Sequence, residues 1–326
     1  MKILISSSHS YPAQNNDEGY GLKPTLYPSS SAYATFDLLV RGLLELGHDV
    51  KYFLQKGIKT DILTDLPIVS QITRDVEINH RMLDSDHNRF WDTINWNKPY
   101  VISCHIHPKF SKTYWGEPSE KWICPSKFLA EALNINRYVY NGINPKDYYY
   151  SSVKEDLLLF MGSMEWGMQK GLDTAIKISQ KVGMKLVVLG GAKSIETINN
   201  INQICSNYKN ISYLGDVRGK KKAELLAKAC CFIFPTRLDE SFGLSMVEAL
   251  VSGTPVICSD KGACPEIINS KLGFVCKTEA DYIHALENIK TISSADCRKS
   301  ALEKYDYHVM ANNFIKEYQS ELLKGE

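Results

Sequence analysis

The sequence predicts an α/β protein of two doubly wound domains, and three observations support this prediction. The chain has 326 residues, about twice the ~150 residues of an ordinary domain. In both halves, short apolar runs alternate with stretches whose apolar residues recur at helical spacing, which is typical of strand–helix–strand units and a parallel sheet. Residues 141–150, NGINPKDYYY, interrupt this alternation with turn residues and aromatics. We interpret them as the segment between the two domains.

The first half opens with an apolar run, KILISSS, that predicts a buried strand. After a polar loop over residues 9–31, apolar residues recur at helical spacing over residues 32–46, and Gly47 ends this helix. HDVKYFL and, farther along, YVISC predict the next strands. WICPSKFLAEAL predicts a further strand followed by a helix that Ser126 caps. This half therefore has the elements of a first parallel sheet.

The second half repeats the alternation after residue 150. The runs that predict strands are LLLFMGS, LVVLGGA, ISYLGD, FIFPT and PVICSD. Helical stretches lie between them at residues 171–182, 220–229 and 243–251. This half is therefore predicted to form a second doubly wound domain.

Composition and charge exclude several classes of protein. The formal net charge is +1, and the chain lacks the basic stripe with interleaved aromatics that a nucleic-acid binder shows. The nine cysteines include no Cys-x-x-Cys pair, which favours thiols in a reducing compartment over a zinc site. No apolar run approaches the ~18 residues that a membrane span needs. The N-terminal run KILISSS is too short for the core of a signal peptide and lacks a cleavage pattern. We therefore expect a cytoplasmic protein with, at most, a weak peripheral membrane contact.

The segment PTRLDESFGLSMVEALVSGTPVICSD has the strongest chemical pattern. A strand ends at Pro235, Glu240 precedes a Phe-Gly pair, and a helix then runs through Glu248. The N-terminus of that helix offers unpaired N–H groups and about half a positive charge, and Gly243 lets a ligand approach the backbone. This arrangement suits a diphosphate with an acid on either side for sugar hydroxyls. The alternative is that the two glutamates cap the helix and lie on its solvent face.

This segment resembles the signature of family 4 of the retaining glycosyltransferases, which adopt the GT-B fold. YNGINPKDY, LFMGSMEWGMQKGLDTAI, ICPSKFLAE and DYHVMANNFIKEYQSEL are similar to other segments of that family. The resemblance implies two Rossmann-like domains with a deep cleft between them. Residues 1–148 would bind the acceptor and residues 149–305 the nucleotide sugar, and a helix at 306–326 would pack back on the first domain.

The resemblance also implies roles for residues around the donor. Glu240 would hold hydroxyls of the transferred sugar, and Glu248 would hold the ribose hydroxyls of the nucleotide. Backbone N–H groups of Phe242, Gly243 and Leu244 would face the diphosphate and the sugar.

Lys170, in a Lys-Gly step, would neutralise the leaving diphosphate by the same resemblance. Cleavage leaves negative charge there, and a site without metal must supply positive charge itself. No Asp-x-Asp motif follows a strand where it could hold a divalent ion, and Asp84-Ser85-Asp86 lies in a polar stretch that predicts a loop. The sequence therefore predicts a metal-independent reaction. Alternatively, Lys170 is a solvated lysine near a helix start.

The chain departs from the family at one position of the donor loop. The family usually has an arginine directly after the glycine of this strand, whereas here Gly162 is followed by Ser163. Arg237 is a candidate to supply the missing charge, and the Ser163 hydroxyl is a weaker one. The departure affects the expected phosphate affinity more than the expected reaction class.

In the first half, VISCHIHPKF resembles a family strand that ends in a histidine beside the reacting sugar. This comparison puts His105 at that position and His107 two residues later, although a histidine at a strand end is often structural. In the loop before the first helix, Gly19 and Gly21 match a glycine pair that lets donor and acceptor approach the backbone. A loop without function is the equal alternative.

Two further features lie in the second half. By the family pattern, Val217 would pack against the nucleotide base. Residues 218–222, RGKKK, form the only dense basic run. Such a run is typically a solvated turn before a helix, and contact with a lipid phosphate is the functional alternative.

Together these features predict a retaining glycosyltransferase. It would move a hexose-type sugar from a UDP- or GDP-sugar, with UDP favoured, to a glycan, a glycolipid or a small hydroxylated acceptor, without a cofactor. Two alternatives stay open: a degenerate protein that only binds a sugar nucleotide, and a nucleotide-sugar epimerase of the same fold. A nicotinamide-dependent dehydrogenase is disfavoured because no Gly-x-Gly-x-x-Gly follows the first strand.

Overall fold

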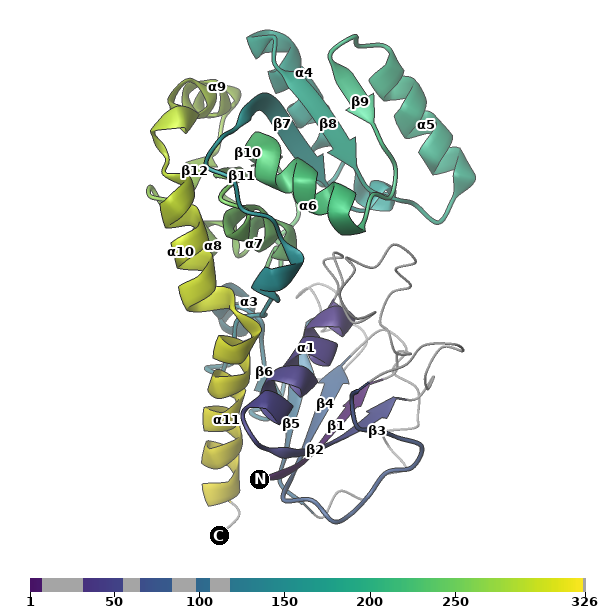
Figure 1. Ribbon diagram of the computed structural model, residues 1–326, viewed down its shortest axis with the longest axis vertical. Helices are drawn as coiled ribbons and strands as arrows, with labels where there is room; N and C mark the ends of the chain where they lie inside the picture. The colour runs from purple at the N-terminus through teal and green to yellow at the C-terminus, as the bar shows by residue number, and fades with distance from the viewer. Residues whose placement is uncertain (8–31, 55–64, 84–97, 106–117, 325–326) are drawn as a thin grey trace. The chain divides into compact units, whose positions relative to one another are not determined.

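The computed structural model describes residues 1–7, 32–54, 65–83, 98–105 and 118–324. The chain divides into two compact units (Figure 1). Unit 1 comprises Met1–Asn144 and Lys304–Glu326, and unit 2 comprises Pro145–Glu303. The last part of the chain therefore belongs to the same unit as the first. The expected boundaries after residues 148 and 305 lie within a few residues of these division points.

Within the described residues, unit 1 forms a six-stranded sheet in the order β3-β2-β1-β4-β5-β6, and every pairing is parallel. Its strands are β1 (Lys2–Ser7), β2 (Asp49–Leu54), β3 (Ile68–Val69), β4 (Ile78–Leu83), β5 (Tyr100–Cys104) and β6 (Trp122–Ile123). Its helices are α1 (Ala32–Glu45), α3 (Lys127–Ala132) and α11 (Tyr307–Leu323). Helices α1 and α11 pack together, and an alanine-sized group at Gly42 would already crowd Ala311.

Unit 2 forms a second six-stranded parallel sheet, in the order β12-β11-β10-β7-β8-β9. Its strands are β7 (Glu155–Met161), β8 (Lys185–Leu189), β9 (Ile211–Tyr213), β10 (Ala229–Phe234), β11 (Val256–Ser259) and β12 (Gly273–Cys276). Its α-helices are α4 (Leu172–Val182), α5 (Ile195–Ser206), α6 (Gly219–Lys228), α7 (Leu244–Val251), α8 (Cys264–Ile267) and α9 (Glu279–Asn288), and α10 (Ser294–Tyr305) leads back to unit 1. Short 3-10 turns are η2 (Pro145–Asp147), η3 (Met164–Trp166) and η4 (Ile289–Thr291).

The strands and helices that the sequence predicts are confirmed, and so is the α/β class. Ser126 caps α3 as expected, because its hydroxyl accepts a hydrogen bond from the Leu129 backbone N–H at 3.1 Å. All nine cysteines are free and buried, so they pack as small apolar residues. The reducing compartment stays a prediction.

Strand β4 is an element that the sequence analysis missed. Its sequence, INHRML, has polar residues where a buried strand usually has apolar ones. His80 is nonetheless fully buried, because its two ring nitrogens pair with the Tyr318 hydroxyl at 2.6 Å and the Ser103 hydroxyl at 2.7 Å. Burial lowers the pKa of His80 to about 3, so the ring is neutral at physiological pH. Partners so distant in sequence cannot be read from a local pattern.

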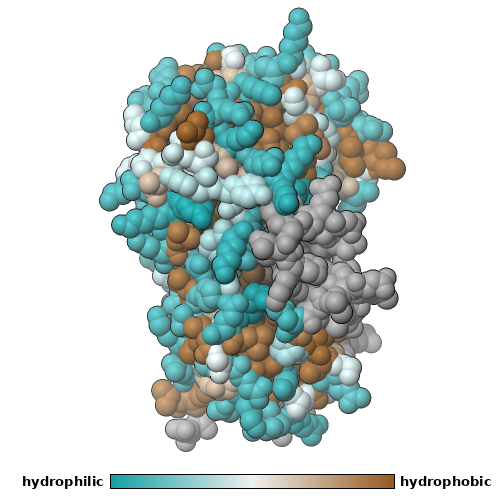
Figure 2. Space-filling view, in the orientation of Figure 1, coloured by the Kyte–Doolittle hydropathy of each residue, from teal (hydrophilic) through white to brown (hydrophobic). Residues whose placement is uncertain are grey.

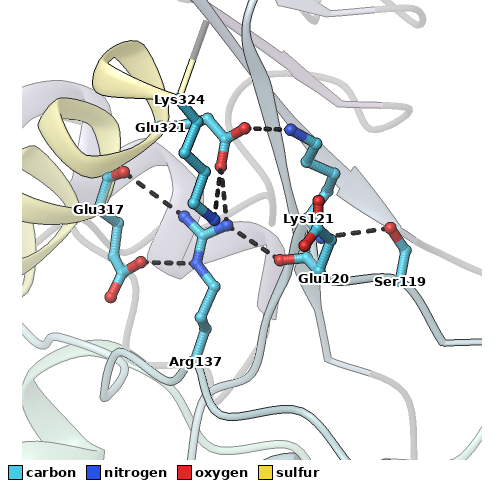
Figure 3. Close-up of polar contacts among 7 residues, drawn as sticks. All are labelled: Ser119, Glu120, Lys121, Arg137, Glu317, Glu321 and Lys324. Carbon is cyan, nitrogen blue, oxygen red and sulfur yellow. Dashed lines mark hydrogen bonds and ion pairs between the residues drawn. The ribbon is translucent and has the colours of Figure 1, made fainter.

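The end of α11 is held to unit 1 by a group of charged side chains (Figure 3). Arg137 pairs with Glu317 at 2.7 Å and with Glu321 at 3.0 Å, and Lys121 also pairs with Glu321. Glu321 is only 2% exposed. Because a buried carboxylate requires such partners, these contacts fix the position of the helix along its own unit.

The surface of the described residues is mixed in polarity. On the face seen in Figure 2, hydrophilic residues surround small apolar groups. Within the described ranges, no helix is both long enough and apolar enough to cross a membrane.

Candidate functional site

The strand order of unit 2 creates a topological switch point. The chain runs outward from β7 through β8 to β9 on one side, and outward from β10 through β11 to β12 on the other. Open parallel sheets bind ligands outside the carboxyl ends of their strands at such a point. The segments that leave β7 and β10, residues 162–171 and 235–244, contain most of the candidate residues. The topology alone therefore brings them together.

Lys170 and Glu240 meet at this switch point. The Lys170 ammonium lies 2.6 Å from a carboxylate oxygen of Glu240, and the side chains are 19% and 15% exposed. The same ammonium lies 5.5 Å from the centre of the Phe234 ring, within reach of a cation–π contact. Lys170 is thus an oriented cation at a strand end, and the alternative of a solvated lysine is wrong.

The backbone around Lys170 explains its orientation. The Lys170 N–H donates to the Trp166 carbonyl at 2.7 Å, which closes the turn after η3. Gly171 then has φ +84°, and a Cβ there would lie 2.0 Å from the Pro235 carbonyl oxygen, so only glycine fits. A Cβ at Gly162 would lie 2.9 Å from the Lys170 side chain. Gly171 allows the backbone to turn directly after Lys170, and Gly162 leaves room for the Lys170 side chain.

The start of α7 lies on the other side of the switch point. Phe242 is buried, and Gly243 has φ +92° immediately before the helix begins at Leu244. The first N–H groups of an α-helix have no acceptor within the helix, and they carry partial positive charge. The loop before them is fixed because the Ala263 N–H donates to the Glu240 carbonyl at 2.9 Å. Glu240 and the helix start are therefore held by the same short loop.

Glu248 lies inside the protein, one turn after Leu244. It is 1% exposed, and its Oε1 accepts from the Tyr148 hydroxyl at 2.7 Å and from the Lys222 ammonium at 2.8 Å. The alternative that Glu248 lies on the solvent face of its helix is therefore wrong. The two donors come from Tyr148, the residue after η2, and from Lys222 on α6.

Tyr148 and Lys222 are site residues that the sequence analysis missed. Lys222 is 5% exposed, whereas Lys220 and Lys221 are exposed, so the interpretation of the basic run as a solvated turn is wrong at this one position. A signal was available: Lys222 lies four residues before Leu226 on the face of α6 that apolar spacing marks as buried. A lysine on such a face requires a carboxylate partner.

Ser163 and Arg237, the two candidates to replace the family's arginine, differ in their contacts. Ser163 is exposed. Arg237 binds Asp173 through two contacts of 2.8 Å and the Thr174 hydroxyl at 2.9 Å. This guanidinium lowers the pKa of the Asp173 carboxyl. The structure thus directs Arg237 to the first turn of α4, where it also contacts the Met168 carbonyl.

The remaining candidates are Val217 in unit 2, His105 in unit 1 and residues outside the described ranges. Val217 is half-buried and lies two residues before α6 begins at Gly219. In unit 1, His105 follows β5, its ring meets Phe36 edge-on at 6.0 Å, and burial lowers its pKa to about 4. Gly19, His107 and the Asp84-Ser85-Asp86 segment lie outside the described residues. Among the residues that are described, no three His, Cys, Asp or Glu side chains form a metal-binding group; metal independence stays a prediction.

Comparisons with known proteins concern the fold and the family resemblance of the chain. Residues 150–308 match the family model "Glycosyl transferases group 1". The O-antigen chain mannosyltransferase RfbU of Salmonella typhimurium is 26% identical over 192 residues, which cover 56% of this chain and 53% of RfbU. The chain thus spans about half the length of the curated relatives it matches.

Two solved structures resemble the whole chain. The glycosyltransferase AviGT4, involved in avilamycin A biosynthesis, aligns with a TM-score of 0.72 at 20% identity over 98% of both chains. HepE of Anabaena, solved with UDP-glucose, aligns with a TM-score of 0.66 at 11% identity, over 98% of this chain and 100% of HepE. Such likeness establishes the GT-B architecture of two Rossmann-like domains. The chain therefore has the GT-B fold, and its residues 150–308 are similar to the group 1 glycosyl transferases.

Proposed function

We propose that this protein is a retaining, metal-independent glycosyltransferase of family 4. It transfers a hexose-type sugar from a UDP- or GDP-sugar, with UDP favoured, to a glycan, a glycolipid or a small hydroxylated acceptor. It acts in the cytoplasm, and a lipid-linked acceptor would bring it into peripheral contact with the membrane. The UDP-glucose bound to its structural relative HepE supports the choice of donor.

The observation that carries this proposal is the Lys170–Glu240 pair at the switch point of unit 2. A cation and an acid lie next to one another where a parallel sheet binds its ligand. The start of α7, which favours anions, follows within the same loop. A sugar diphosphate has matching parts, since its phosphates require positive charge and its sugar hydroxyls require an acceptor.

The chemistry follows from these groups. The bond between the sugar carbon and the diphosphate oxygen breaks, and the oxygen keeps the electron pair. Lys170 and the N–H groups at the start of α7 stabilise the developing charge, and Glu240 holds the sugar by its hydroxyls. An acceptor hydroxyl forms the new bond to the same sugar carbon and passes its proton to the oxygen of the leaving diphosphate. Since Lys170 and Glu240 bind each other, a bound diphosphate would compete with Glu240 for the ammonium.

His105 serves as a neutral group in this proposal. Its pKa of about 4 leaves the ring uncharged at physiological pH. A neutral imidazole can donate or accept one hydrogen bond to a sugar hydroxyl, as the resemblance implies for this position, but it supplies no charge to the leaving group.

The test begins with a thermal-shift screen of UDP-, GDP- and ADP-sugars. A donor at 100 times its dissociation constant stabilises a protein by about 2.7 kcal/mol. The best donor is then incubated with candidate acceptors and with a chelator, and the anomeric configuration of the product is read by NMR.

We expect transfer with retained configuration and full activity in the chelator. Inverted product would overturn the retaining mechanism, and activity that returns only with magnesium or manganese would overturn metal independence. Binding without transfer or donor hydrolysis would identify a sugar-nucleotide-binding protein instead, and a change of configuration at the sugar C2 would identify an epimerase.

A further inference from the structure

Glu248 lies in a buried polar group whose other members come from separate parts of unit 2. The side chains of Lys222 and Glu248 are 6% and 2% exposed, and their charged atoms lie 2.8 Å apart. Tyr148, which is 6% exposed, donates its hydroxyl hydrogen to the same Oε1 atom at 2.7 Å. One oxygen of one carboxylate thus accepts from the segment after η2 and from α6.

A carboxylate buried to this extent needs such donors to keep its charge. Burial alone disfavours the charged form, and an unpaired buried acid takes up a proton. The protonation state decides what the group can bind, since an ionised carboxylate only accepts hydrogen bonds and a protonated one also donates. A lysine ammonium at 2.8 Å favours the accepting form.

The location of the group connects it with the donor site. Glu248 lies four residues after Leu244, so the two lie on one face of α7 and one turn apart. Lys222 lies in the first turn of α6, which begins two residues after Val217. Helix α7, which contains Glu248, begins at Leu244, an expected contact of the diphosphate. Helix α6, which contains Lys222, begins two residues after Val217, the expected contact of the base.

We propose that Lys222 and Tyr148 are positioning residues that keep the Glu248 carboxylate ionised and fixed so that it accepts hydrogen bonds from the ribose hydroxyls of the donor. This inference rests on the proposed function. A purely structural ion pair would stabilise unit 2 without affecting ribose recognition. The two cases differ in what they predict for ligands with and without the 2′-hydroxyl.

The experiment measures dissociation constants by calorimetry from pH 6 to 9. The ligand is UDP or GDP, whichever stabilises the wild type more, together with its 2′-deoxy counterpart. The variants are Lys222→Met, Lys222→Arg, Tyr148→Phe and Glu248→Gln, with Lys221→Met as the matched control at an exposed lysine. Each constant is divided by the wild-type value at the same pH, which removes the titration of the ligand phosphate.

For Lys222→Met we expect ribonucleotide affinity about tenfold weaker near pH 7, the effect of losing a hydrogen bond to a charged group. The loss should shrink as the pH rises, because burial without a paired cation disfavours the charged form of a carboxylate. Affinity for the 2′-deoxy ligand should change less. Lys222→Arg should restore the wild-type pattern, and Lys221→Met should match wild type throughout.

Tyr148→Phe keeps the inference testable if Lys222→Met fails to fold, because it removes only a hydroxyl. We expect the ribonucleotide to bind a few-fold more weakly and the 2′-deoxy ligand to bind as before.

If both variants weaken the two ligands equally, or if neither weakens the ribonucleotide, the positioning role is overturned. If wild type binds neither UDP nor GDP, the proposed function itself fails. If Glu248→Gln alone leaves the preference for the ribonucleotide intact, the ribose assignment fails.

Discussion

Two lysine–glutamate pairs of unit 2 lie close to α7, one with its glutamate in the loop before the helix and one with its glutamate on the helix itself. They differ mainly in how deeply their side chains are buried. Lys170 and Glu240 lie 2.6 Å apart with side chains 19% and 15% exposed. Lys222 and Glu248 lie 2.8 Å apart with side chains 6% and 2% exposed, and Tyr148 adds a further donor. The first pair reaches solvent and can exchange partners, whereas the second is enclosed. If the proposed function holds, burial, and not the identity of the residues, separates a pair that exchanges partners with the ligand from one that keeps a binding residue in position.

The energetics of ion pairs give this difference a scale. A pair in contact with water contributes about 0–1 kcal/mol to stability. Removal of one partner from a buried pair costs about 3–5 kcal/mol, because the other charge stays buried without compensation. Substitutions in the two pairs should therefore separate into effects on activity and effects on stability.

The largest expected effect is on stability. Lys222→Met should lower the free energy of unfolding by about 3–5 kcal/mol, and Lys170→Met by at most about 1 kcal/mol. The double variant Lys222→Met/Glu248→Gln should recover part of the loss, since it leaves no uncompensated charge. Urea unfolding followed by circular dichroism gives the three values. Equal losses for the two single variants would remove the distinction between the pairs.

The second effect concerns turnover. Lys170→Ala should reduce kcat about a hundred- to a thousandfold, which is typical for the loss of one preorganised charge donor. Lys193→Ala, at an exposed lysine that follows β8, is the matched control and should behave like wild type. Steady-state assays with the preferred donor measure both. Unchanged turnover in the first variant would show that the segment after β7 does not contact the leaving group.

The fold was predictable from sequence because its elements have local signals. The apolar runs of β7 and β10 and the glycine before α7 mark the elements next to Lys170 and Glu240, whereas the strand order that brings the two residues together is seen only in the structure. By contrast, the partners of Glu248 lie at sequence separations of 26 and 100 residues. These residues come together only in the folded structure. The buried position of Lys222 on α6 was a local clue, but its neighbours in the basic run obscured it.

Arg237 shows a second limit of sequence reasoning. Its place two residues before Asp239 in the signature segment made it a candidate for the charge that Ser163 does not supply. Direction cannot be read from such a pattern, and the structure points the guanidinium at Asp173, with both side chains about half exposed (51% and 52%). The donor loop is thus left with Lys170 as its oriented cation among the candidates that the sequence named.

This arrangement predicts that a second cation would be gained by Ser163→Arg. The variant should bind the preferred nucleoside diphosphate more tightly by about 1.5–3 kcal/mol, the range for a hydrogen bond to a charged group. Calorimetric titration beside wild type measures the change, and Ser163→Gln controls for side-chain length. An unchanged affinity would mean that Arg237 leaves Asp173 and reaches the phosphates when ligand binds. Arg237→Gln would then weaken binding in the wild-type background.

The smallest expected effect tests whether the partly exposed pair, Lys170 and Glu240, exchanges partners. In the unliganded protein the Glu240 carboxylate competes with the diphosphate for the Lys170 ammonium, since the two lie 2.6 Å apart. Glu240→Gln removes the competing charge and keeps the shape, so UDP should bind a few-fold more tightly, in line with the ~0–1 kcal/mol of a partly exposed pair. Transfer should nevertheless fall, because the amide holds the sugar hydroxyls less strongly than a carboxylate does. The buried pair should respond in the opposite direction, with Glu248→Gln weakening UDP. If both glutamine variants weaken UDP alike, the two pairs play the same role and the contrast drawn from their burial is wrong.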